Sequence, residues 1–113
     1  ITCAAPNLRE RPSNRFNQGN GDRAVKVSDR ELLEIHKKRL TRILDVAVLN
    51  GDEAVILGAF GCGAFQNKPE VVARAAKEVI ADYPHAFKTI EFAVYCPPRD
   101  DTNFKVFEWV MGA

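Results

Sequence analysis

Residues 53–80 read EAVILGAFGCGAFQNKPEVVARAAKEVI, and this stretch decides the fold. The apolar run EAVILG at 53–58 predicts a strand of a parallel sheet that is buried on both faces. A helix is predicted to follow, because Asn67 and Glu70 have the spacing of a helix cap and Pro69 suits the first turn. The glycine-rich segment GAFGCGAF at 58–65 joins the two elements. A strand that leads through a short loop into a helix is typical of an α/β fold.

The segments before this stretch continue the same alternation. ITCAA, at 1–5, is short and apolar, and we expect it to be a strand. Residues 6–27 are rich in Pro, Asn, Gly and Arg and predict a loop of a length that is uncommon in compact domains. Ser28 and Glu31 form a capping box, which starts a helix that we expect to run to about Leu49.

The segments after it complete the pattern. KTIEFAVYC, at 88–96, predicts a third strand, and NFKVFEWVM, at 103–111, predicts a short last helix that Asp101 or Thr102 can cap. Strands and helices in this order predict an α/β fold of mainly parallel strands with flanking helices. A sheet of only three strands leaves an exposed edge, where a further strand or a second copy of the chain could pair.

Composition limits the classes of protein that the chain can belong to. Its 113 residues predict one domain, and 46% hydrophobic and 27% charged residues are ordinary for a globular protein. A net charge of +1 does not favour binding to duplex nucleic acid or to an anionic membrane. No run approaches the roughly 18 apolar residues of a membrane span, and no signal-peptide pattern occurs. Because the chain opens on Ile1 in an apolar segment, we expect it to be part of a longer protein.

Cysteine and histidine usage points to a reducing environment. Cys3, Cys62 and Cys96 are an odd number of cysteines far apart in the sequence, which argues against a disulfide framework. No CxxC pair occurs, and His36 and His85 are distant from each other, so no zinc site is expected. The simplest interpretation is a cytoplasmic protein without metal or cofactor.

The glycine-rich loop is the strongest candidate site. It lies at the carboxyl end of a predicted parallel strand, where ligands of α/β sheets bind, and leads towards a helix N-terminus that favours anions. Gly61 and Gly63 allow a ligand to approach the backbone closely, and the amides from Gly61 to Phe65 could form a concave nest for a phosphate. Phe65 could pack against a ribose or a base. The alternative is a tight turn whose two phenylalanines, Phe60 and Phe65, point into the core.

The same residues carry a resemblance. The chain closely resembles the C-terminal half of the microbial-type poly(ADP-ribose) glycohydrolase family over essentially its whole length. The matching stretches are ITCAAPNLR at 1–9, SNRFNQGNGDR at 13–23, SDRELLEIHKKRLTRILDVA at 28–47, LGAFGCGAFQNKPEVVARAAKEVI at 57–80 and FAVYCPP at 92–98. The resemblance implies a three-layer, macrodomain-like α/β fold. Residues 1–113 would be the C-terminal part of that domain, with the long loop at 6–27.

The resemblance also implies roles for the loop. In the family this loop holds the diphosphate of ADP-ribose through backbone amides. The resemblance therefore assigns diphosphate and ribose binding to Gly61, Cys62, Gly63, Ala64 and Phe65. Asn7 is a further candidate for the cleft, although an Asn after a proline also suits a simple turn. The implied partner is ADP-ribose or poly(ADP-ribose).

One departure from the family determines what the chain can do. The catalytic signature, a triple glycine followed by Gln-Glu-Glu, is absent, and the only glutamines, Gln18 and Gln66, are followed by glycine and asparagine. We assign no catalytic residue, because cleaving a glycosidic bond requires a carboxyl group at the leaving oxygen. The chain is interpreted as the ADP-ribose-binding half of an enzyme that hydrolyses ribose–ribose O-glycosidic bonds when complete. The alternatives are a non-catalytic ADP-ribose- or nucleotide-binding module and a remnant without ligand that assembles through its strand edge.

Other polar residues have simpler expected roles. Cys62 is a packed thiol or a reactive one, and Cys3 and Cys96 are expected to be buried thiols in strands. His36 is expected on a solvated helix face, and His85 on the surface. Three glutamates are read as structural: Glu53, Glu70 and Glu91. Four loop arginines contact a polymeric substrate or only keep the loop soluble: Arg9, Arg11, Arg15 and Arg23. A last apolar group is read as a core-facing helix, with a partner-binding helix as the alternative: Phe104, Phe107, Trp109, Val110 and Met111.

Overall fold

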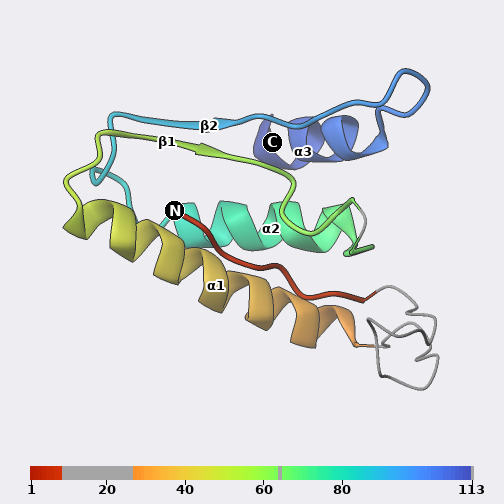
Figure 1. Ribbon diagram of the computed structural model, residues 1–113, viewed down its shortest axis with the longest axis horizontal. Helices are drawn as coiled ribbons and strands as arrows, with labels where there is room; N and C mark the ends of the chain where they lie inside the picture. Colours follow the sequence, from red (N-terminus) through yellow and green to blue (C-terminus); the bar gives the residue numbers. More distant parts are fainter. Residues whose placement is uncertain (9–26, 64, 113) are drawn as a thin grey trace, which may run out of the picture.

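The computed structural model describes residues 1–8, 27–63 and 65–112. In these ranges the element order is α1 (Asp29–Leu49), β1 (Ala54–Leu57), α2 (Pro69–Ile80), β2 (Thr89–Phe92) and α3 (Thr102–Gly112) (Figure 1). This mixed architecture is compatible with the predicted α/β class. Ala64 and the four arginines predicted for the long loop lie outside the described residues. No helix among those described is both long enough and apolar enough to cross a membrane.

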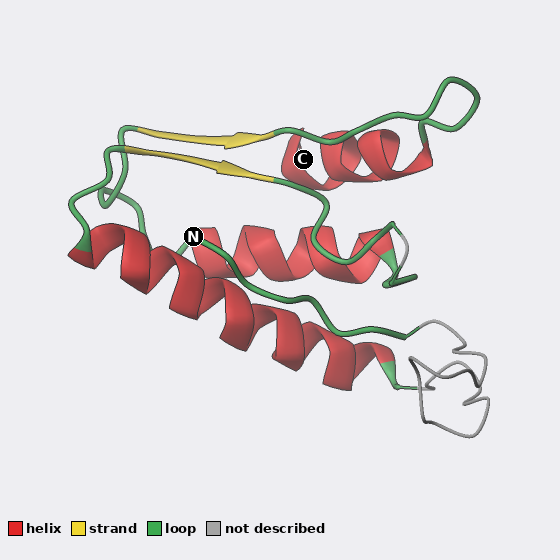
Figure 2. Ribbon diagram, viewed as in Figure 1, coloured by secondary structure: helices red, strands yellow, loops and turns green. Residues whose placement is uncertain are grey.

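The two strands form a parallel sheet, as predicted, with α2 as the crossover between them (Figure 2). Ala54 pairs with Thr89 at one end and Leu57 with Phe92 at the other. One more backbone hydrogen bond continues the ladder, from the Ala93 amide to the Leu57 carbonyl at 2.7 Å. The predicted strand at 88–96 is therefore shorter than expected, because its partner β1 ends at Leu57.

The helices cover one face of the sheet, with α2 lying between α1 and α3 (Figure 1). Leu44 of α1 and Ala73 of α2 are completely buried, and the rings of Phe92 and Phe107 lie 5.6 Å apart between β2 and α3. The other face of the sheet is open: Ile56 is 70% exposed. The expectation that β1 is buried on both faces is therefore wrong for this chain.

The N-terminal segment is not the strand that the sequence predicts. Residues 1–8 contain no regular secondary structure, so the described residues form two strands rather than three. The backbone of the N-terminal segment forms hydrogen bonds with α1 and with the loop after β1 instead. The Ala4 carbonyl accepts from the Arg39 guanidinium at 2.9 Å, and the Leu8 amide donates to the Phe65 carbonyl at 3.0 Å. A groove of about 360 Å³ separates Ile1 and Cys3 from β1. Without a ladder to β1, an apolar and β-compatible segment stays irregular.

The helix ends confirm the predicted cap of α1 and correct that of α2. Ser28 accepts from the Glu31 amide at 3.1 Å, as the capping box predicts. At α2 the N-cap residue is Lys68, which makes no side-chain cap, so Asn67 is not the cap. At α3 the residue before the first helical one is Asp101, one of the two expected caps, and its carbonyl accepts from the Lys105 amide at 2.9 Å. The Asp100 carboxylate also accepts from the Thr102 amide at 3.0 Å.

Several burial expectations also need correction. Cys3 and Cys96 are exposed rather than buried, because neither lies in a strand of the described sheet. In α3 only Phe107 is fully buried, at 3% exposed, while Phe104 is 45% and Trp109 76% exposed. A helix packed along one side buries only the residues that face its neighbour, so α3 is a core-facing helix for part of its apolar sequence.

Candidate functional site

An open cleft of about 550 Å³ lies between the N-terminal segment and the loop that follows β1. A volume in this range suits a small organic ligand. One wall is formed by residues 2–5. The other wall is formed by Phe60, Gly61, Gly63 and Phe65. The structure therefore brings three of the predicted site residues together at the carboxyl end of β1, where a ligand was expected.

Gly61 is required by the packing of the loop. Its φ is +79°, a conformation that residues with a side chain rarely adopt. A Cβ at this position would lie 2.7 Å from Nδ2 of Asn67 and 2.8 Å from Cβ of Ala5. The backbone at Gly61 therefore touches both the start of α2 and the opposite wall of the cleft, and only glycine fits there.

Gly63 differs, because nothing in the described chain requires it to be glycine. Its φ is not in the left-handed region, and a Cβ would meet no atom within 4 Å. The position lines the cleft, so a side chain would project into the space that a ligand needs. In the described part of the chain, the amides of Gly61 and Gly63 find no acceptor.

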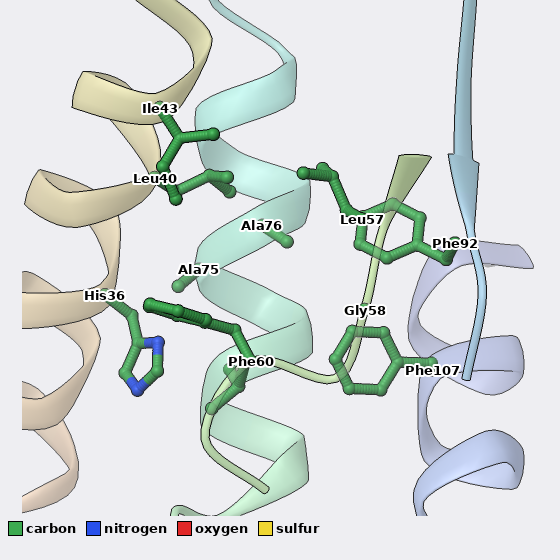
Figure 3. Close-up of a pocket in the computed structure, with 11 residues that line it drawn as sticks. His36, Leu40, Ile43, Leu57, Gly58, Phe60, Ala75, Ala76, Phe92 and Phe107 are labelled. Carbon is green, nitrogen blue, oxygen red and sulfur yellow. The ribbon is translucent and has the colours of Figure 1, made fainter. Parts of the chain in front are cut away.

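The two phenylalanines of the loop have different surroundings. Phe60 packs inward, with its ring edge-on to His36 at a centroid distance of 5.6 Å. Figure 3 shows it between His36 and Ala75, at one end of an apolar cavity of about 70 Å³. Phe65 is half-buried and lines the cleft. The alternative in which both rings point into the core thus holds for Phe60 and not for Phe65.

Cys62 and Asn7 do not line the cleft as it is shaped here. The Cys62 amide already donates to the Ala59 carbonyl at 3.0 Å, so a ligand would have to share or displace that bond. Burial, and to a lesser degree the negative charge of Glu70, raises the pKa of the Cys62 thiol to about 12. The thiol is therefore protonated at neutral pH, and of the two expected roles the packed thiol fits. Asn7 lies next to Leu8, whose amide is bonded to the loop.

Asn67 is the polar centre of the site, and sequence analysis missed it. Its side chain is 2% exposed. Nδ2 donates to the carbonyls of Pro6 at 2.7 Å, Gly61 at 2.8 Å and Phe65 at 3.3 Å. The Asn67 backbone amide donates to the same Gly61 carbonyl at 2.9 Å. The preceding residue, Gln66, has a φ of +58°, an uncommon conformation for a residue with a side chain.

His36 completes this arrangement, and the expectation that it is solvated is wrong. The ring is 2% exposed, and its Nε2 lies 2.8 Å from Oδ1 of Asn67. Burial is the main cause that lowers the pKa of His36 below 6.5, and the charge of Arg39 adds to it, while the bond to Asn67 acts in the opposite direction. The neutral imidazole is therefore favoured near pH 7.

A signal for both residues was present in the sequence. His36 follows Leu32 by four positions and precedes Leu40 by four, so it falls on the apolar face of α1. The neighbouring run Lys37-Lys38-Arg39 obscured that spacing. Asn67 comes two residues before Pro69, where a cap is the ordinary expectation, and only the folded loop shows that its side chain turns inward instead.

The cleft can bind but holds no acid. The described residues that line it supply backbone groups, small side chains, one hydroxyl, one thiol and two aromatic rings. The three glutamates read as structural, Glu53, Glu70 and Glu91, are all exposed, as expected of that role. The described lining contains no carboxyl group that could protonate a leaving oxygen.

Comparison with known proteins identifies relatives of this architecture. A poly(ADP-ribose) glycohydrolase from Deinococcus radiodurans, solved in complex with ADP-ribose, matches 74% of this chain with 30% sequence identity and a TM-score of 0.68. A mutant of the enzyme from Thermomonospora curvata matches 72% with 26% identity and a TM-score of 0.68. No protein-family model and no curated protein sequence matches the chain. The structures confirm the resemblance to microbial poly(ADP-ribose) glycohydrolases. The chain spans about a third of their length: 34% of the first and 32% of the second.

Proposed function

We propose that the cleft binds the diphosphate of ADP-ribose through the backbone amides of the loop at 61–65, with Phe65 packed against a ribose. The observation that carries the proposal is Gly63, whose lack of a side chain is explained by a ligand and by no contact within the described chain. The free amides of Gly61 and Gly63 supply donors for phosphate oxygens. The Deinococcus radiodurans relative, solved in complex with ADP-ribose, supports the choice of ligand.

In this proposal the chain is the C-terminal part of a longer, macrodomain-like enzyme with a three-layer α/β architecture. The complete protein would hydrolyse ribose–ribose bonds of poly(ADP-ribose), and the acid would come from residues outside this chain. The described helices cover one face of the sheet, and the open face that carries Ile56 is where the third layer would lie. Residues 1–113 alone are expected to bind and not to cleave.

The test is a calorimetric titration of ADP-ribose into the chain and into two variants. Gly63→Glu places a carboxylate in the cleft, and the matched Gly63→Gln adds nearly the same volume without charge. Both fit sterically, since no atom lies within 4 Å of the Cβ position. We expect Gly63→Glu to lose at least tenfold in affinity, about 1.4 kcal/mol, and Gly63→Gln to lose less. Equal affinity in all three proteins would refute binding at this loop.

A non-catalytic module that binds ADP-ribose is the second candidate, since the described lining, which has no carboxyl group, is compatible with it as well as with the enzyme. The two candidates predict the same binding and differ in what the rest of the protein contains. A triple glycine followed by Gln-Glu-Glu in the sequence encoded before Ile1 would support the enzyme. Release of ADP-ribose from poly(ADP-ribose) by residues 1–113 alone would contradict both.

A further inference from the structure

We propose that Asn67, held by His36, is a positioning residue that keeps the carbonyl groups of Gly61 and Phe65 turned away from the cleft, so that a bound anion does not face them. The proposal concerns the conformation of the loop. Of the measurements described below, only the titration with ADP-ribose rests on the proposed function. Neither residue lines the cleft, and both therefore act through the loop.

The first step is the orientation of the Asn67 side chain. The three groups around Nδ2 are the backbone carbonyls of Pro6, Gly61 and Phe65, which can only accept hydrogen bonds. The amide nitrogen must face them, so Oδ1 faces His36. Because Oδ1 can only accept, Nε2 of His36 must carry the proton. The neutral ring then has its one hydrogen on the nitrogen that this contact requires.

The second step is what these bonds do to the loop. The carbonyl and the following N–H of a trans peptide point in opposite directions. Asn67 does not line the cleft, so holding the Gly61 carbonyl on Asn67 keeps that oxygen out of the cleft, where it would repel an anion. The Phe65 carbonyl is held in the same way. A flip of the Gly61–Cys62 peptide would also break the bond from the Cys62 amide to the Ala59 carbonyl, and a flip of the Phe65–Gln66 peptide would break the bond from the Gln66 amide to the Gly63 carbonyl.

The third step is the connection to helix α1. His36 anchors the loop through Asn67, while Arg39, three residues later on α1, donates to the Ala4 carbonyl at 2.9 Å. Asn67 also bonds the carbonyl of Pro6, which directly follows the opposite wall. Both walls of the cleft are thus attached to the same turn of α1. This attachment fixes the distance between the two walls before a ligand binds. When a site is already formed, fewer groups have to be ordered as the ligand binds, so less binding free energy is lost to entropy.

The experiment uses two substitutions of His36 that separate hydrogen bonding from packing. His36→Gln can still present an N–H where Nε2 lies. His36→Phe keeps an aromatic ring against Phe60 but cannot donate. Asn67→Ala removes all the side-chain hydrogen bonds of Asn67. Val79→Ala, in the buried face of α2 away from the loop, is the control for a general loss of stability. Each protein is measured by the ¹H–¹⁵N spectrum and hydrogen exchange of the loop amides, and by titration with ADP-ribose.

We expect Asn67→Ala and His36→Phe to shift the Gly61 and Gly63 amide signals, to speed their exchange and to lower affinity at least tenfold. His36→Gln should stay within about threefold of the unmodified chain, and Val79→Ala should leave the loop signals in place. If His36→Phe keeps the loop spectrum and the affinity while His36→Gln loses them, His36 only packs and the proposal is wrong. If the unmodified chain binds no ADP-ribose but the loop amides respond as described, the proposed function fails and the positioning role stands.

Discussion

The loop after β1 and the outer face of β1 differ in how much they depend on interactions within the chain. In the loop the polar groups are joined internally: the Asn67 side chain alone satisfies three carbonyls and accepts from His36. On the outer face of the sheet, Ile56 is 70% exposed, and Tyr95, just beyond β2, is 79% exposed. The loop thus depends on the identity of single residues, whereas the outer face depends only on general apolar character. Substitutions should be costly in the first region and cheap in the second.

The largest effect is expected from Gly61→Ala. The added Cβ would meet Asn67, whose side chain cannot move without losing buried hydrogen bonds, and alanine disfavours a φ of +79°. We expect a loss of about 3 kcal/mol in the free energy of unfolding, from backbone strain together with a broken buried hydrogen bond. Urea denaturation followed by circular dichroism measures it. Gly63→Ala is the matched control, with an expected change within about 0.5 kcal/mol. Equal losses would show that the loop is not locked at Gly61.

A smaller effect is expected from pH, again confined to the loop region. Because the pKa of His36 is lower in the folded protein than its ordinary 6.5, the folded state resists protonation. The stabilisation from neutral His36 is fully present above pH 6.5 and declines as the pH falls through 6.5 towards the lowered value. Each unit by which the pKa is lowered corresponds to about 1.4 kcal/mol.

Urea denaturation at a series of pH values between about 7.5 and 5.5 tests this, the range being set by the ordinary titration of histidine. His36→Gln, which does not titrate, should flatten the curve in that window. His85 is exposed and serves as the control, so His85→Gln should leave the slope in place. A slope that survives in His36→Gln would assign the pH dependence to another group.

The smallest effect on stability is expected on the outer face of the sheet, from Ile56→Lys. Ile56 pairs with Glu91 across the strands, so a lysine there faces an opposite charge and loses little burial. We expect the free energy of unfolding to change by less than about 0.5 kcal/mol. Light scattering at rising protein concentration should show less self-association than the unmodified chain, since a charge disfavours pairing of exposed strands.

The matched control for this prediction is Leu57→Lys, one residue along β1. Leu57 lines the apolar cavity under the helices, where a charge has no partner (Figure 3). It should destabilise the protein by several kcal/mol, as the burial of an unpaired charge does. If both lysines were equally harmful, the outer face of β1 would tolerate as few kinds of residue as the inner face does.

Local sequence patterns predicted the elements well where the relevant interactions are local. The span of α1, its capping box at Ser28 and the position of β1 follow from spacing and turn chemistry within a few residues, and the parallel pairing with β2 follows from the alternation of strands and helices. The N-terminal segment was mispredicted because a strand requires a partner in register, and that partner is chosen by the whole fold. Residues 1–5 have strand composition but bond to α1 instead.

The candidate site divides in the same way. By itself the sequence determined that small residues and an aromatic follow a strand, and that a triple glycine followed by Gln-Glu-Glu does not occur in residues 1–113. Only the tertiary structure decided which glycine is needed by packing and which leaves room for a ligand, and that His36 and Asn67 are buried against each other. The reason is that the Asn67 side chain bonds the carbonyl of Gly61, which is 6 residues before it, and the carbonyl of Pro6, which is 61 residues before it. The bond to Pro6 exists only after α1, the loop and the N-terminal segment have come together.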